Sequence, residues 1–78
     1  MSGASVFLSC DVGTEKEIVH KMSGISGILQ ANKLAGIYDI VAELHADSEK
    51  GIARLVWRLR SSASIRACLT ILVAEKDL

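Results

Sequence analysis

Apolar residues alternate with polar or small residues in four stretches of the chain, the pattern of β-strands that bury one face. These stretches are residues 4–10, 28–34, 38–45 and 65–73. The turn at Ala35-Gly36 joins the second stretch to the third. Because the connection is so short, these two strands are predicted to form an antiparallel hairpin.

Two further segments carry apolar residues at the spacing of an α-helix. Thr14 and Glu17 are spaced as a capping box at the start of the first helix, which is predicted to end near Met22. Ser48, preceded by an aspartate, caps a second helix predicted over residues 48–61. The apolar face of this second helix is formed by Ile52, Leu55, Val56 and Leu59.

The order strand, helix, strand, strand, helix, strand predicts a single α+β domain over residues 1–78. It is the order of the ferredoxin-like βαββαβ fold. Each strand-helix-strand half of that fold makes a right-handed crossover. The expected architecture is a four-stranded antiparallel sheet with two helices on one face.

Two helices leave the other face of such a sheet uncovered, and this open face is predicted to be apolar. Alternation places Val6, Leu8, Cys10, Ile40, Ala42, Leu44, Leu69 and Ile71 on the helix side. It places Phe7, Val41, Cys68 and Leu72 on the open side, with Leu29 beside them. A large exposed apolar patch favours a partner, so the four open-side residues are predicted to form the interface of a sheet-to-sheet homodimer. The alternative is that alternation assigns a strand to the wrong face.

The overall composition agrees with self-association. Half of the 78 residues are apolar, and nine basic residues balance nine acidic ones. A neutral chain this apolar is unlike a disordered tail, and it lacks the basic excess of a stand-alone nucleic-acid binder. No direct nucleic-acid contact is therefore expected. No membrane contact is expected either, because no apolar run reaches the length that spans a bilayer. No signal peptide is recognisable either, so the expected location is cytoplasmic.

Side chains that could carry out catalysis are scattered. His20 and His45 fall in different elements, and Cys10 and Cys68 lack the spacing of metal ligands. The cysteines are also predicted to lie on opposite faces, which excludes a disulfide within the chain. We therefore expect no enzyme, no metal and no cofactor. Trp57 is interpreted as a residue at the edge of the core, with an interface anchor as the alternative.

The segment Gly36-Ile37-Tyr38-Asp39 resembles the glycine-x-aromatic-aspartate motif of the Lrp/AsnC ligand-binding domain, also called the RAM domain. The resemblance extends over about residues 4–75, including the final Leu69-Thr70-Ile71-Leu72-Val73 strand. Family members usually carry an N-terminal helix-turn-helix domain, and this chain resembles the stand-alone form without it. The family's Pro-Gly-Val before the second and fourth strands reads Ser26-Gly27-Ile28 and Ala63-Ser64-Ile65 here, so less standard loops are expected.

The resemblance implies a homodimer of packed sheets, often assembled further into tetramers, octamers or larger rings. It also implies that a small effector, typically an amino acid, binds between dimers. The positions that match the family's effector site are Gly36, Tyr38, Asp39, Thr70, Ile71 and Leu72. Asp39 has an alternative role as a hairpin-end residue that accepts hydrogen bonds from backbone amides.

The function that follows is a regulatory domain that senses a small ligand and does not itself bind DNA. A full-length Lrp/AsnC regulator is a further expected partner. One alternative is an oligomerisation or adaptor subunit without a ligand. The other is a small dimeric enzyme of the ferredoxin-like type.

Overall fold

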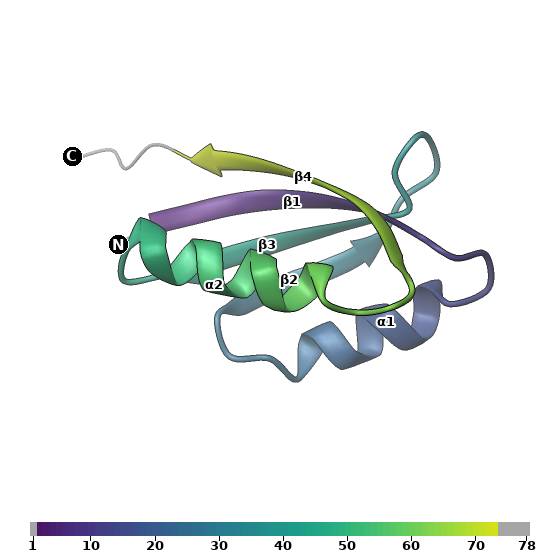
Figure 1. The fold of residues 1–78 in the computed structure, drawn as a ribbon, viewed down its shortest axis with the longest axis horizontal. Helices are drawn as coiled ribbons and strands as arrows, with labels where there is room; N and C mark the ends of the chain where they lie inside the picture. The colour runs from purple at the N-terminus through teal and green to yellow at the C-terminus, as the bar shows by residue number, and fades with distance from the viewer. Residues whose placement is uncertain (1, 74–78) are drawn as a thin grey trace.

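The computed structural model describes residues 2–73, which form a four-stranded sheet and two helices. The elements are β1 (Ser2–Cys10), α1 (Glu15–Ser23), β2 (Ile28–Lys33), β3 (Ile40–Ala46), α2 (Glu49–Arg60) and β4 (Ile65–Val73). The strand order is β2-β3-β1-β4, and all neighbouring strands are antiparallel. Both helices lie on one side of the sheet (Figure 1), with α1 against β2 and α2 across β1, β3 and β4. The predicted ferredoxin-like fold is confirmed.

The connection between β2 and β3 differs from the predicted tight turn. It is a loop over residues 34–39, closed by a 2.7 Å hydrogen bond from the Leu34 amide to the Asp39 carbonyl. Gly36 in this loop has φ +145°, a conformation that residues with a side chain rarely adopt. Tyr38 and Asp39 therefore belong to the loop and not to the strand, which begins at Ile40.

The two helices begin differently, and one predicted cap is absent. The Ser48 side chain accepts a hydrogen bond from the Gly51 amide at 3.3 Å, so α2 has the expected cap. Thr14 makes no cap bond to α1. Its hydroxyl instead donates to the Asp11 carbonyl at 2.6 Å, within the turn that precedes the helix. The capping-box prediction is wrong because this turn already uses the threonine hydroxyl.

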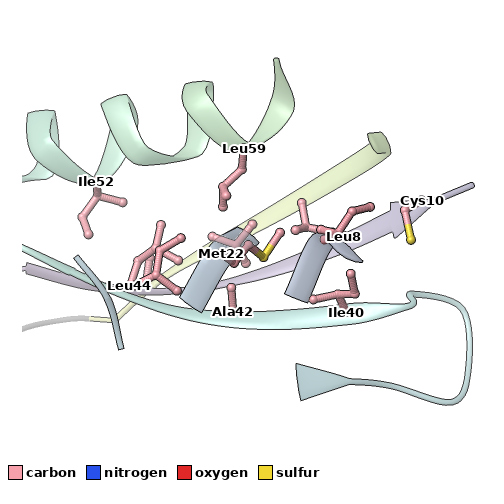
Figure 2. Close-up of a cluster of buried hydrophobic side chains, with 12 residues drawn as sticks. Leu8, Cys10, Met22, Ile40, Ala42, Leu44, Ile52 and Leu59 are labelled. Carbon is pink, nitrogen blue, oxygen red and sulfur yellow. The ribbon is translucent and has the colours of Figure 1, made fainter. Parts of the chain in front are cut away.

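The core lies between the two helices and the covered face of the sheet (Figure 2). The paired strands β1 and β3 bring Val6 opposite Ala42 and Leu8 opposite Ile40, and all four side chains are fully buried. Ile52 and Leu59 of α2 point toward the sheet, as Figure 2 shows. Alternation therefore predicted the faces of β1 and β3 correctly.

The face predicted for β4 is wrong. β1 residue Val6 pairs with Thr70, Leu8 with Cys68, and Ala4 with Leu72. Residues paired across a ladder share a face of the sheet. Three β4 residues thus lie on the helix side, and these are Cys68, Thr70 and Leu72. The open face instead carries Leu69, the partner of Phe7, and Ile71, the partner of Ser5.

The cause is an irregularity near the start of β4. Ser9 pairs with Ala67 but the next residue, Cys10, pairs with Ile65, so Arg66 is an extra residue in the ladder. One inserted residue moves every later side chain to the opposite face. Ile65 packs against the core, and simple alternation from it reaches Leu69 and Ile71, which explains the error.

Two predictions built on that assignment change with it. Cys68 and Leu72 are removed from the predicted dimer interface, because a partner packed on the open face lies on the other side of the sheet. Cys10 and Cys68 also lie on the same face, so opposite faces are not the reason that no disulfide forms. Both thiols are free in the structure.

Candidate functional site

The predicted ligand motif is located at one end of the sheet, in the loop between β2 and β3. The Asp39 amide donates to the Leu8 carbonyl at 2.8 Å, which holds the loop against the end of β1. The ring of Tyr38 lies 5.9 Å from the ring of Phe7, centroid to centroid, at an angle of 52°. A tilted pair at this distance is a favourable aromatic contact. The motif is therefore anchored to β1 at two points.

The Asp39 side chain is also engaged within the chain. Its Oδ2 accepts hydrogen bonds from the Cys10 amide at 2.9 Å and from the Ser9 hydroxyl at 3.4 Å. Burial raises the pKa of the neighbouring Cys10 thiol, and the Asp39 charge adds to this effect. Within residues 2–73, no hydrogen bond falls on Oδ1. The carboxylate thus ties the loop that precedes β3 to β1 and keeps one oxygen for another donor.

The remaining predicted ligand residues lie toward the other end of the sheet. Thr70 pairs with Val6 and Leu72 with Ala4, whereas Asp39 contacts Cys10. At about 3.3 Å per residue along β1, four to six residues correspond to roughly 13–20 Å. Ile71 in addition faces the open side. One chain therefore does not bring the six predicted residues together, and a site that uses both groups needs two chains.

The open face combines apolar and polar groups. Phe7 and Val41 lie opposite each other at its centre, and Leu69 and Ile71 extend it along β4. Beside them, the Ser5 hydroxyl lies 2.8 and 3.0 Å from the two carboxylate oxygens of Glu43. Sequence alternation placed Ser5 on this face but could not give the register that pairs it with Glu43.

His45 is a second polar group that the sequence did not single out for this position. It lies opposite Gly3 in the ladder between β1 and β3. Within the part of the chain that the structure describes, its Nε2 is buried and has no hydrogen-bond partner. A buried polar atom without a partner is destabilising. His20 lies exposed on α1, so the structure assigns the two histidines to different elements, as expected.

A groove of about 460 Å³ lies between α2 and β4. Thr70 and Leu72 line its β4 side, and Trp57 lines its α2 side. Trp57 is 74% exposed, so it lies outside the core, and the alternative of an interface anchor stays a prediction. Over residues 2–73, no three metal-ligating side chains gather at one place. No described helix is long and apolar enough to cross a bilayer.

The fold occurs in solved structures over the whole length of this chain. The hypothetical protein PHS023 from Pyrococcus horikoshii has a TM-score of 0.91 at 19% identity, covering 97% of this chain and 93% of that protein. E. coli AsnC has a TM-score of 0.86 at 13% identity, covering 99% of this chain and 53% of AsnC. An AsnC family transcriptional regulator from Agrobacterium tumefaciens has a TM-score of 0.80 at 12% identity, covering 96% of this chain and 51% of that one.

The chain thus spans nearly all of one small protein and about half the length of the two AsnC proteins. No protein-family model and no curated protein matches it. Similarity at these identities shows a common fold. The fold that the motif resemblance implied is the fold that the AsnC structures contain.

Proposed function

We propose that this chain is a regulatory domain of the Lrp/AsnC type that binds a small effector, with an amino acid as the expected class. The observation that carries the proposal is the common fold over 99% of this chain and about half of AsnC. The Gly36-Ile37-Tyr38-Asp39 motif, which lies in the loop between β2 and β3, supports it independently. That the domain acts without DNA contact of its own, in the cytoplasm, stays a prediction from the sequence.

We propose a homodimer in which two open faces pack against each other. The support is the exposed apolar surface on that face, where Leu69 is 44% and Ile71 49% exposed. Phe7 and Val41 lie on the open face as predicted, and in the proposed interface Leu69 and Ile71 would replace the two residues that the β4 irregularity turns to the helix side. Burial of this surface would supply the hydrophobic free energy of association.

We place the effector between two such dimers. Gly36, Tyr38 and Asp39 would come from one dimer, and Thr70 and Leu72 from the neighbouring one, whereas Ile71 would be buried in the interface within its own dimer. The support is the separation of the two groups along β1, which prevents one chain from forming the site. Oδ1 of Asp39 would accept a hydrogen bond from the ammonium group of an amino acid, a charge-assisted contact.

A thermal-shift series against the twenty amino acids tests the sensing function, with solution mass measured on the same samples. A ligand at a hundred times its Kd stabilises the folded state by about 2.7 kcal/mol, which is readily detected in a domain of this size. We expect a shift for at least one amino acid, together with a change in assembly size. A folded, oligomeric chain without a shift for any of them would contradict effector sensing.

One observation favours the adaptor alternative, in which the chain assembles with a full-length Lrp/AsnC regulator and binds no effector. The Asp39 carboxylate already accepts hydrogen bonds from Cys10 and Ser9, as its structural role requires. Native mass spectrometry of a mixture with such a regulator tests this function. Mixed oligomers that form equally with and without amino acids would support the adaptor over the sensor.

A further inference from the structure

The two edges of the sheet are built differently. β2 forms one edge with six residues, a register irregularity near Leu29, and the polar residues Gln30, Asn32 and Lys33. Short length, irregularity and charge are the devices by which natural sheets keep an edge from pairing with another strand. The β2 edge is thus protected.

The β4 edge has little of this protection. β4 has nine residues and pairs only with β1 among the described strands. After Arg66 it carries no charged residue and no proline, and Leu69, Ile71 and Leu72 are each between 44% and 53% exposed. Its outer backbone groups are regularly spaced along this stretch. An edge of this kind favours the addition of another strand.

The groove between α2 and β4 runs beside this edge on the helix side of the sheet. Its walls are mainly apolar and include Ile52, Ala53, Val56 and Trp57 from α2 with Thr70 and Leu72 from β4, and two charged residues of α2 complete the lining. Alternate side chains of a strand added to β4 would point to the helix side of the sheet. They would therefore enter the groove and contact Trp57 and Leu72.

We propose that the β4 edge and the groove together bind an extended peptide segment of another protein, as a fifth strand antiparallel to β4. Main-chain hydrogen bonds to β4 give the binding energy, and the groove selects apolar side chains at every second position. This interaction is separate from the open face, which lies on the opposite side of the sheet. It does not require an effector, but it uses Thr70 and Leu72, so a peptide bound here would compete with an effector site that includes these two residues.

The charges of the groove give the peptide a direction. The groove is lined by Glu49, at the start of α2, and by Arg60, at its end. Because α2 leads into β4 through a short connection, Arg60 lies near the start of β4 and Glu49 near its end. An antiparallel fifth strand would run parallel to α2. Its N-terminal end would meet Glu49 and its C-terminal end Arg60, so we expect a basic residue first and an acidic residue last.

The same helix argues against a second copy of this chain as the occupant. Pairing of β4 with its own copy about a two-fold axis would bring two α2 helices together on one face of a continuous sheet. Each α2 carries only one acidic residue, Glu49. It carries four basic residues, which are Lys50, Arg54, Arg58 and Arg60. Like charges at that contact repel, so the edge is better suited to a different chain.

A synthetic peptide as long as β4 provides a direct probe, with the blocked sequence Lys-Thr-Val-Thr-Val-Thr-Val-Thr-Asp. Trp57 is the single tryptophan of the chain and lines the groove, so its fluorescence reports binding. We expect a saturable change in emission. The peptide with its terminal Lys and Asp exchanged has the same composition and should bind roughly tenfold more weakly, as expected for the reversal of two exposed charge pairs. Methylation of the amides that face β4 should abolish binding.

Two charge variants provide the matched protein control. Arg60→Glu should weaken the first peptide and strengthen the exchanged one. Arg54→Glu makes the same charge change on the same helix, but Arg54 does not line this groove, so it should leave both affinities unchanged. Circular dichroism would verify that both exposed substitutions leave the fold intact.

Three results would overturn the proposal. The first is no emission change with any of these peptides. The second is equal binding of the methylated peptide, which would mean apolar docking without strand addition. The third is self-association through this edge. In that case Trp57 emission of the peptide-free protein would change on dilution, and Arg60→Glu would strengthen the self-association. That result would show that a second copy occupies the edge.

Discussion

Both faces of the sheet carry apolar side chains, but only one face is covered by other elements of this chain. On the helix side, Val6 and Leu8 of β1 pack with Ile40 and Ala42 of β3 under two helices and lose all contact with solvent. On the open side, Leu69 and Ile71 remain about half exposed. The first face accounts for the folding of the domain. The second is the face on which we propose that another copy packs, so substitutions on the two faces should have different consequences.

The largest expected effect is that of Phe7→Glu on the open face. The new carboxylate would be buried without a partner at the centre of the proposed interface, close to Val41 and on the same face as Glu43. We expect the dimer to weaken by at least about a thousandfold, equivalent to about 4 kcal/mol. Light scattering across a concentration series measures this. A variant that remains a stable dimer would contradict packing through the open face.

Ile40→Ala tests the completed face. Ile40 is fully buried, and removing a large aliphatic side chain from a core costs about 2–5 kcal/mol of unfolding free energy. Urea unfolding measures the loss. Ile37→Ala is the control, because Ile37 is 91% exposed in the loop between β2 and β3 and should change stability by less than about 0.5 kcal/mol. Equal losses in both variants would contradict the location of Ile40 in the core.

A neighbouring pair on β4 tests the corrected register. Ile71→Asp places a charge on the open face and should weaken the dimer by roughly a hundredfold, or about 2.7 kcal/mol. Leu72→Asp places the same charge one residue further along, on the helix side, and should leave the dimer mass unchanged. Analytical ultracentrifugation of both variants decides between the two registers. The reverse outcome would restore the arrangement predicted from simple alternation.

The smallest effect is expected for Asp39→Asn. The amide keeps an oxygen that can accept from the Cys10 amide but loses the negative charge, so we expect a loss of about 1–2 kcal/mol in unfolding free energy. Any thermal shift induced by an amino acid should disappear in the same variant. Ser9→Ala removes only the 3.4 Å hydroxyl contact to Asp39 and provides the control. An effector response that survives in Asp39→Asn would remove this carboxylate from the site.

The order of the elements and the faces of β1 and β3 were predictable because simple alternation holds along both strands, whose ladder runs from Ser2 to Leu8 without a register shift. Val6 and Leu8, with Phe7 between them on the other face, each lie opposite a buried residue of β3. β4 was not predictable in the same way. Both of its faces are apolar, and the extra residue Arg66 shifts the pattern without any composition signal such as glycine. Hydrophobic periodicity cannot detect an insertion between two equally apolar faces.

The residues of the candidate site stay a prediction from the sequence, and the sequence could not give their arrangement in space. The motif around Asp39 is visible in the sequence, whereas its bond to the Cys10 amide depends on how β3 and β1 meet in space. The groove beside Trp57 has the same origin, since it requires α2 and the edge of β4 to lie side by side. The hydrogen bond and the groove both depend on contacts between residues that are far apart in the chain, and local sequence patterns do not specify such contacts.

The extra residue at Arg66 has a consequence for how such domains could diverge. Deletion of Arg66 would leave Ile65 opposite Cys10 and Ala67 opposite Ser9, so the ladder would become regular and every later residue of β4 would keep its face. The irregularity therefore lets the chain gain or lose one residue at the start of β4 without reversing the sides of the strand. Homologues that differ by such an indel would still present the same side chains to their partners.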